Sequence, residues 1–461
     1  MQQLQVDREE KVHTGFTTKV ISVISDVFSE LIKKYLPDPF LFAVILTIIT
    51  GLFGIVLQNK TPLDMIAYWG QGFWGLLTFA MQMILVMIGG SVLAQAPIIQ
   101  RFMDWFADIP KTPKGAIALA TFFGGAMSYL NWGFGLIAGT LLAKKLAERV
   151  PGVHYPLIIA SSYTGFGFYA FGISSSAPLL IATSGHFLEK QMGIIPISQT
   201  LFHPINIMMA IAMLVVIPLV NSMIKPQGTI FIYKPEIIEG AAEQKSKTDA
   251  TPAERAESNP IFIMIAGAMG IVFIVYYFFV KKGTFDINII NFIFLFLAII
   301  FHGTTRNFIN AVQAAGKGIG SMAIQFPFYA GIMGMMTGSG LVTTIAGWFV
   351  AISTPQTLPF WGWVSSMFIN IFVPSGGGHW VVQGPFMIEA AKTMGANVAA
   401  VSMSVALGNG VQDIIQPMWV LPALAMSGLG IRDIMGYNVI AFICACVIVG
   451  TGILAWGFIS V

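Results

Sequence analysis

Residues 318–388 contain no Asp, Glu, Lys or Arg, yet proline, glycine and histidine interrupt this apolar run in PSGGGHW, at residues 374–380. A soluble domain carries about 25% charged residues, whereas this chain of 461 residues is 10% charged and 56% hydrophobic. Apolar runs of about 20 residues span a bilayer as helices. We therefore predict an all-α polytopic membrane protein. Its net charge of +3 is too small to indicate a nucleic-acid partner.

Apolar segments long enough to cross a bilayer can be read directly from the sequence. They give about nine crossings, at residues 39–57, 72–96, 155–188, 200–224, 260–280, 286–302, 320–338, 397–427 and 434–459. Ahead of them, residues 15–35 mix apolar and charged positions as an amphipathic helix at the membrane surface does. The charge-rich residues 225–258 predict an aqueous linker.

Two further apolar stretches have a polar break at their centre. The first, residues 115–143, contains SYLNWGFG, which leaves two arms of about 13 residues, or about 20 Å of helix each. Such arms are too short for a hydrocarbon core of about 30 Å. Lysines flank the stretch on both sides, at positions 111, 114, 144 and 145. Because positive residues mark the cytoplasmic side, we predict a re-entrant hairpin that opens there, with one long tilted and kinked helix as the alternative.

The second stretch contains PSGGGHW, with arms at 358–373 and 381–392. Its flanks nearly lack Lys and Arg, which predicts that this hairpin enters from the non-cytoplasmic side. Each hairpin precedes a span that is itself broken, by FGISSSAP (171–178) in the first case and by GNGVQDIIQP (408–417) in the second. Hairpin followed by broken helix therefore occurs twice.

The order of crossings makes these repeats inverted, because the extra span at 260–280 starts the second repeat on the opposite face. The two-residue cluster Lys281 and Lys282, on the predicted outer side, disagrees with the positive-inside rule. The predicted parts are an N-terminal amphipathic segment (1–38), a first membrane repeat (39–224), a cytoplasmic linker (225–258), and an extra span plus a second inverted repeat (259–461). The N-terminus is predicted to be cytoplasmic.

Inverted repeats with helices interrupted near the midplane are typical of secondary transporters. Exposed backbone at membrane depth is tolerated only where it lines a polar cavity, so the breaks are the predicted sites. A small-anion channel is the alternative within membrane transport. A membrane enzyme is disfavoured, because the breaks contain no acidic pair, metal-ligand spacing or nucleophile motif.

Motifs throughout the chain resemble one bacterial family. They are LPDPFLFAVILT, LNWGFGLIAG, YTGFGFYAFGISSSAPLLIATSGHF, FVPSGGGHWVVQGPFM and GNGVQDIIQPMWVLPALA. The chain is similar to the short-chain fatty acid transporters of the acetoacetate and butyrate uptake type, which are grouped with the ion transporter superfamily. This resemblance implies two inverted repeats, a homodimer in the bacterial inner membrane and elevator-like movement. The dicarboxylate members of that superfamily carry Ser-Asn-Thr at both hairpin tips, and the tips of this chain differ, so ligand contacts do not transfer.

A short carboxylate needs hydrogen-bond donors for its oxygens and an apolar wall for its tail. The predicted substrate-binding residues, taken from the tips and the first break, are Ser128, Asn131, Trp132, Gly133, Ser174, Ser175, Ser176, Ser375, Gly376, Gly377, Gly378 and His379. Neither tip carries Arg or Lys, so helix ends, a proton or a co-transported cation must balance the anion. A carrier of dicarboxylates or amino acids is the runner-up, although a second charged group would need a partner that the tips lack.

One ionisable residue, Asp413, lies inside the second break, where burial of a charge is costly and therefore indicates function. Asn409, Asp413 and Gln416 are the predicted cation-coupling residues, and a sodium ion near Asn131 and Asn409 is the candidate bound ion. Asp413 as a proton carrier and Asp413 as a helix cap are both alternatives. For His379 the alternative is a histidine bonded to backbone carbonyls. No other cofactor is predicted.

Overall fold

The computed structural model describes residues 8–9, 39–225, 230–233, 251–316 and 319–459. The predicted surface helix at 15–35 and most of the linker at 225–258 lie outside the described residues. Within the described ranges the chain is built from helices, apart from a two-residue antiparallel pairing of β1 (Arg8–Glu9) with β2 (Ile230–Phe231). The all-α architecture is therefore confirmed.

The first half, up to residue 225, contains long apolar helices and a cluster of short ones. Its helices are α2 (Pro39–Gln58), α3 (Pro62–Gly72), α4 (Leu77–Ala94), α5 (Pro97–Ala107), α6 (Pro113–Leu130), α7 (Trp132–Arg149), α8 (Tyr155–Thr164), the 3₁₀ helix η1 (Gly165–Phe171), α9 (Ser176–Ile181), α10 (Glu189–Met192), η2 (Ile197–Gln199) and α11 (Pro204–Met223). Proline begins several of them, because its fixed φ suits the first helical position, where its missing N–H is not needed.

The second half follows the same alternation of long and interrupted helices. Its helices are α12 (Pro252–Ser258), α13 (Pro260–Val275), the π-helical η4 (Tyr276–Val280), α14 (Ile287–His302), α15 (Thr305–Gly316), α16 (Ile319–Ser339), α17 (Leu341–Ile352), α18 (Leu358–Phe372), α19 (Gly376–Met394), α20 (Val398–Asp413), α21 (Pro417–Ser427) and α22 (Ile431–Ile459).

The described residues include six helices long and apolar enough to cross a membrane, or up to eight when each bent pair counts as one span. The sequence predicted about nine. One difference is α14, which has only 16 residues. Another is the predicted span at 320–338, which continues through an 81° bend into α17. The predicted span at 72–96 is shorter than expected, because α3 ends at Gly72 and α4 begins only at Leu77.

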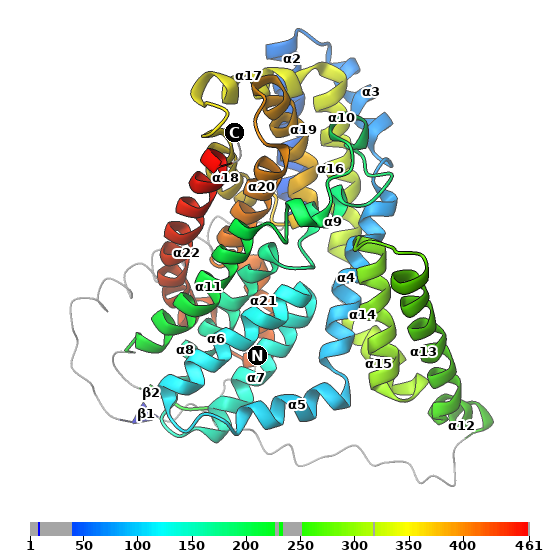
Figure 1. Ribbon diagram of the computed structural model, residues 1–461, viewed down its shortest axis with the longest axis vertical. Helices are drawn as coiled ribbons and strands as arrows, with labels where there is room; N and C mark the ends of the chain where they lie inside the picture. The colour runs from blue at the N-terminus through cyan, green and yellow to red at the C-terminus, as the bar shows by residue number, and fades with distance from the viewer. Residues whose placement is uncertain (1–7, 10–38, 226–229, 234–250, 317–318, 460–461) are drawn as a thin grey trace.

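Both predicted hairpins are pairs of helices that fold back on themselves. In the first, a Cβ on Gly139 of α7 would lie 3.2 Å from Gly124 Cα of α6, so the two arms run side by side. In the second, Gln383 Nε2 of α19 donates a hydrogen bond to Gly362 O of α18 at 3.0 Å. One long kinked helix is thereby excluded at both places. Figure 1 shows α6 and α7 in the lower half of the view and α18 and α19 in the upper half.

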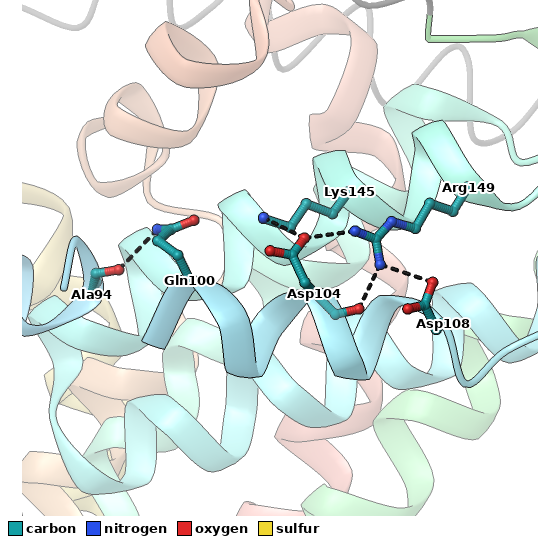
Figure 2. Close-up of polar contacts among 6 residues, drawn as sticks. All are labelled: Ala94, Gln100, Asp104, Asp108, Lys145 and Arg149. Atoms are coloured by element: carbon teal, nitrogen blue, oxygen red, sulfur yellow. Dashed lines mark hydrogen bonds and ion pairs between the residues drawn. The ribbon is translucent and has the colours of Figure 1, made fainter. Parts of the chain in front are cut away.

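The short helix α5 runs across the lower end of the molecule and is held against α7 by ion pairs (Figures 1 and 2). Asp104 accepts from Lys145 Nζ at 2.7 Å and from Arg149 Nη2 at 2.6 Å, and Asp108 pairs with Arg149 at 2.8 Å. These side chains are partly exposed, so each pair contributes about 0.2–1 kcal/mol. The end of the first hairpin that lies opposite its tip is therefore next to α5.

Candidate functional site

The tips of both hairpins and the breaks of both interrupted helices meet at one small cavity. The space in it that the centre of a water-sized molecule can occupy is about 20 Å³. The lining residues come from both halves of the chain and are Met83, Trp132, Phe166, Tyr169, Ser176, Met322, Ser375, Gly376, Gly377 and Trp419. The arms that carry the two tips lie in opposite halves of the molecule (Figure 1), so this cavity is where the inverted repeats converge.

The second hairpin tip offers backbone donors to the cavity. Ser375 is the N-cap of α19, and its side-chain oxygen accepts from Gly378 N at 3.3 Å. Gly376 and Gly377 are the first two helical residues, whose N–H groups have no partner within the helix. The glycines thus form the first turn of α19, whereas the sequence predicted that the second arm begins only at residue 381. Their amides lie at the positive end of the helix dipole.

Other groups approach the two glycines closely, so a side chain at either position would displace its neighbours. A Cβ on Gly376 would lie 3.2 Å from Asn409 Oδ1 and Ser176 Oγ, and 3.3 Å from Tyr169 Oη. A Cβ on Gly377 would lie 2.8 Å from Phe79 Cζ. Side chains at either position would fill the space beside the free amides.

The first hairpin tip is closed by comparison. Asn131 caps α7, with its Oδ1 accepting from Phe134 N at 3.0 Å and its Nδ2 donating to Val86 O at 3.2 Å. Trp132 N donates to Ser174 Oγ at 3.0 Å. What this tip contributes to the cavity is the Trp132 ring, whose centroid is 5.4 Å from that of Trp419.

The structure divides the predicted substrate-binding residues into two groups. Five of them line the cavity: Trp132, Ser176, Ser375, Gly376 and Gly377. The others are outside that lining, namely Ser128, Asn131, Gly133, Ser174, Ser175, Gly378 and His379. The second group includes residues that hold the tips in place, as Ser174 does by donating to Ser128 O at 3.3 Å.

His379 illustrates the second group. Its ring is fully buried, and Nε2 lies 3.0 Å from Ser366 Oγ and 2.5 Å from Gln383 Oε1. Ser366 in turn donates to Val405 O at 2.7 Å. His379 therefore joins α18, α19 and α20 instead of facing the cavity.

A buried polar cluster surrounds Asp413 at the second break. Asp413 Oδ1 accepts from Asn370 Nδ2 at 2.7 Å, and Oδ2 lies 2.8 Å from Tyr169 Oη, within hydrogen-bonding distance. Tyr169 Oη also lies 2.5 Å from Asn409 Oδ1, and the Asn409 amide donates to Asn370 Oδ1. Gln416 Nε2 completes the cluster by donating to Asn370 O at 2.9 Å. The three predicted coupling residues are thus brought together.

Two members of this cluster, Asn370 and Tyr169, were not predicted from the sequence. Asn370 is an amide within the apolar arm α18, and its position in MFINIF was a usable signal. Tyr169 lies on η1, in the motif GFGFYAF, where it is the one polar side chain. Only the packing of η1 against α20 shows that its hydroxyl meets Asp413.

No group of three or more His, Cys, Asp or Glu side chains among the described residues could hold a metal ion. The sodium ion near Asn131 and Asn409 stays a prediction. The side-chain oxygens of both residues already accept hydrogen bonds, from Phe134 N and Tyr169 Oη.

Apolar spanning helices, two hairpins whose tips meet, and a cavity lined by helix N–H groups and aromatic rings define a membrane transporter, because interrupted backbone at membrane depth serves a ligand. Comparison with known proteins is more specific. The family model of short chain fatty acid transporters matches residues 20–455, and the chain belongs to that family.

Two relatives share this length, and both carry the name "putative short-chain fatty acid transporter". The protein of Escherichia coli (strain K12) is 40% identical over 437 residues, covering 94% of this chain and 99% of the relative. The protein of Haemophilus influenzae is 39% identical over 434 residues, covering 92% and 97%.

Solved structures with the same fold are much more distant in sequence. The YdaH transporter of Alcanivorax borkumensis superposes with a TM-score of 0.60 at 13% identity, covering 91% of this chain and 98% of its own. MtrF of Neisseria gonorrhoeae, described with a class of antimetabolite efflux pumps, gives 0.57 at 14% identity, with coverages of 94% and 97%. These likenesses show the fold alone.

Proposed function

We propose that the protein takes up a short-chain monocarboxylate, such as butyrate or acetoacetate, by symport with a cation. The observation that carries this proposal is the open second tip, where the amides of Gly376 and Gly377 reach a cavity walled by Trp132, Phe166 and Trp419. Amides at a helix N-terminus bind anionic oxygens, and the aromatic wall suits a short apolar tail. Family membership supports the same substrate class.

The cavity favours one negative charge over two. The described lining contains no Arg or Lys, so a second carboxylate or an ammonium group would remain unpaired there. A carrier of dicarboxylates or amino acids is therefore the second candidate. A small-anion channel is the third candidate. The closed, buried polar cluster beside the cavity argues against it.

The test is uptake of labelled butyrate into proteoliposomes, with sodium and pH gradients imposed separately. Saturable accumulation against a gradient is expected in response to one of the two cations. Butyramide should compete poorly, because helix dipoles favour the anion. Equal competition by the amide would remove the carboxylate from the proposal, and uptake that never saturates would favour a channel.

The transport cycle is proposed to be elevator-like, in a homodimer in the bacterial inner membrane, with the N-terminus in the cytoplasm. Convergence of two hairpins from opposite halves of the molecule supports alternating exposure of one cavity. Such hairpins are re-entrant if both ends of each lie on one side. Cysteines at Lys114 and Lys145 should then label only from the cytoplasm, and cysteines at Thr354 and Thr393 only from outside. Labelling of either pair from opposite sides would make that hairpin a span.

A further inference from the structure

The polar cluster around Asp413 reaches the transport cavity through one side chain, Tyr169. Tyr169 lines the cavity, and its hydroxyl oxygen lies 2.8 Å from Asp413 Oδ2 and 2.5 Å from Asn409 Oδ1. Asp413 is fully buried and Asn409 is 2% exposed. One hydroxyl therefore connects a buried carboxyl group with the space proposed for the substrate.

If Asp413 is ionised, there are too few hydrogens for the two contacts of the Tyr169 hydroxyl. A tyrosine hydroxyl has one hydrogen, and neither a carboxylate nor an amide oxygen has any. Two O···O contacts at hydrogen-bonding distance, about 2.5–3.0 Å, need two hydrogens. Tyr169 supplies one of them, and a protonated Asp413 supplies the other.

The neighbours of the cluster fix where the second hydrogen lies. Asp413 Oδ1 already accepts from Asn370 Nδ2 at 2.7 Å, so the proton belongs on Oδ2, facing Tyr169. Turning the Asn409 amide round does not remove the shortage, because its oxygen would then face Asn370 Oδ1, to which its nitrogen now donates. With neutral Asp413 donating to Tyr169 Oη and Tyr169 donating to Asn409 Oδ1, both contacts of the Tyr169 hydroxyl have a hydrogen.

No charged partner offsets an ionised Asp413. Among the described residues, no Lys, Arg or His side chain bonds to it, and Tyr163 of α8 donates to its backbone oxygen at 2.6 Å. His379 of α19 is bonded to Ser366 and Gln383. The nearby arm α18 and the short helix α9 contain no ionisable residue, and Cys446 of α22 contacts Met367.

A metal ion fits these contacts less well than a proton. When oxygens of separate residues coordinate one cation, each oxygen lies about 2.3–2.6 Å from the cation. These oxygens are then farther from one another than the oxygens of this cluster are. An unpaired buried carboxylate is costly, so a proton is the simplest neutralising group.

We propose that Asp413 carries the coupling proton and that Tyr169 connects this proton to the substrate cavity. This inference rests on the proposed uptake of a monocarboxylate. With the proton bound, an anion at Gly376 and Gly377 faces a neutral cluster. Without it, a negative charge lies one side chain away and repels the anion. Proton and substrate therefore favour each other's binding, and this coupling is reciprocal.

The first test does not depend on transport. Infrared spectra of the purified protein in lipid nanodiscs at neutral pH should show the C=O band of a protonated, buried carboxyl group. Asp413→Asn should remove this band, and Tyr169→Phe should shift it, because the carboxyl group loses its acceptor. Tyr155→Phe is the matched control, since Tyr155 donates to Ser427 O at 3.0 Å, away from the cluster. A wild-type spectrum without the band overturns the proposal, as does a band that persists in Asp413→Asn or stays unshifted in Tyr169→Phe.

The second test measures coupling in proteoliposomes. Wild-type butyrate accumulation should follow an inward proton gradient and ignore sodium. Asp413→Asn should retain butyrate exchange but lose gradient-driven accumulation by at least about tenfold, a coupling of about 1.4 kcal/mol. Tyr169→Phe should change the pH profile of uptake, and Tyr155→Phe should not. Sodium-driven uptake that ignores pH overturns the inference. If the infrared band behaves as expected but no gradient drives butyrate uptake, the substrate proposal fails and the protonated Asp413 stands.

Discussion

The two hairpin tips have the same plan and opposite chemistry. Asn131 caps α7 and Ser375 caps α19, and a glycine, Gly133 or Gly377, occupies the second position of each helix. At the first tip the first helical N–H, that of Trp132, donates to Ser174 Oγ. At the second tip the first helical N–H, that of Gly376, has no partner within α19, and Gly376 lines the cavity. The inverted repeats thus share a backbone conformation at their tips. The side chains around each tip decide whether it packs against the rest of the protein or can bind a ligand.

The two helix breaks differ in whether they contain an ionisable residue. The first break, between η1 and α9, is held by neutral groups such as Asn206, whose Nδ2 donates to Phe171 O at 3.0 Å. The second break follows directly on Asp413, an ionisable residue. The second repeat therefore holds both the glycine amides at the cavity and the ionisable residue Asp413, and the first repeat supplies much of the wall.

The largest expected effect comes from valine at the two tip glycines. Gly377→Val should reduce butyrate uptake to background with normal protein in the membrane, because its side chain would meet the movable ends of Phe79 and Met83 inside the cavity. Gly133→Val should instead lower the amount of folded protein, since a Cβ there lies 2.9 Å from the backbone oxygen of Met87. Uptake and membrane abundance measured together check this pair. Equal loss of abundance in both variants would break the comparison of the tips.

A second pair tests the breaks. Asn370→Ala and Asn206→Ala each leave buried partners without a donor, which costs about 1–3 kcal/mol, so both should melt at lower temperature. Only Asn370→Ala should also change the pH profile of uptake, because Asn370 donates to Asp413. Thermal unfolding in detergent and uptake across a pH series measure the two effects. A similar change of pH profile in both variants would contradict the assignment of the charge to the second break.

A third pair concerns neighbouring serines. Ser176 lines the cavity, whereas Ser175 is buried outside its lining. Ser176→Ala should raise the KM for butyrate about tenfold, since a hydrogen bond to a charged group contributes about 1.5–3 kcal/mol. Ser175→Ala should leave KM within about twofold, because it removes no contact with the substrate. Initial rates of uptake at varied butyrate concentration give the KM of each variant. A larger rise in KM for Ser175→Ala than for Ser176→Ala would contradict the placement of the site.

The smallest effect is expected at the α5 contact, which holds the arms of the first hairpin. A hydrogen bond from Lys145 holds the pKa of Asp104 below its ordinary value. The lowered value means that this stabilisation is present above the pKa of an unfolded aspartate and is lost as pH falls through the lower one. Lys145→Ala should therefore reduce stability by about 0.2–1 kcal/mol at neutral pH and less in acid. The exposed Lys190→Ala on α10 is the control, and a pH-independent loss would argue against the ion pair.

Much of this architecture could be predicted from the sequence, because a bilayer imposes simple local requirements. Arms too short to span, with lysines at both ends of the first pair, predicted the hairpins at 115–143 and 358–392. The structure confirms that both fold back. The break at 408–417 was also predicted, and the structure bends the helix pair there by 42°. The number of spans was less predictable, since the 81° bend at Gly340 depends on packing. The same holds for the start of α19, where three glycines continue the helix because Ser375 caps it.

The candidate site was predicted only in outline. Asp413, Asn409 and Gln416 were identified by their position in an apolar helix, and the structure adds Asn370 and Tyr169 to them. His379 had the same sequence signal, yet its ring points to Ser366. The direction of a side chain depends on which helix packs against it, and that information is distributed over residues far apart in the chain.

The sequence by itself determined that this chain lies in a membrane, where its helices are interrupted and which repeat carries the ionisable residue. Apolar length and the cost of burying charge are properties of short segments, so they can be read locally. Only the tertiary structure decided which tip is open, because Asn131 is satisfied by Val86 and Phe134 while the amides of Gly376 and Gly377 meet no such neighbour in α19. Contacts between distant helices satisfy the hydrogen bonds of some polar groups and leave others without a partner. The groups left without a partner form the candidate site.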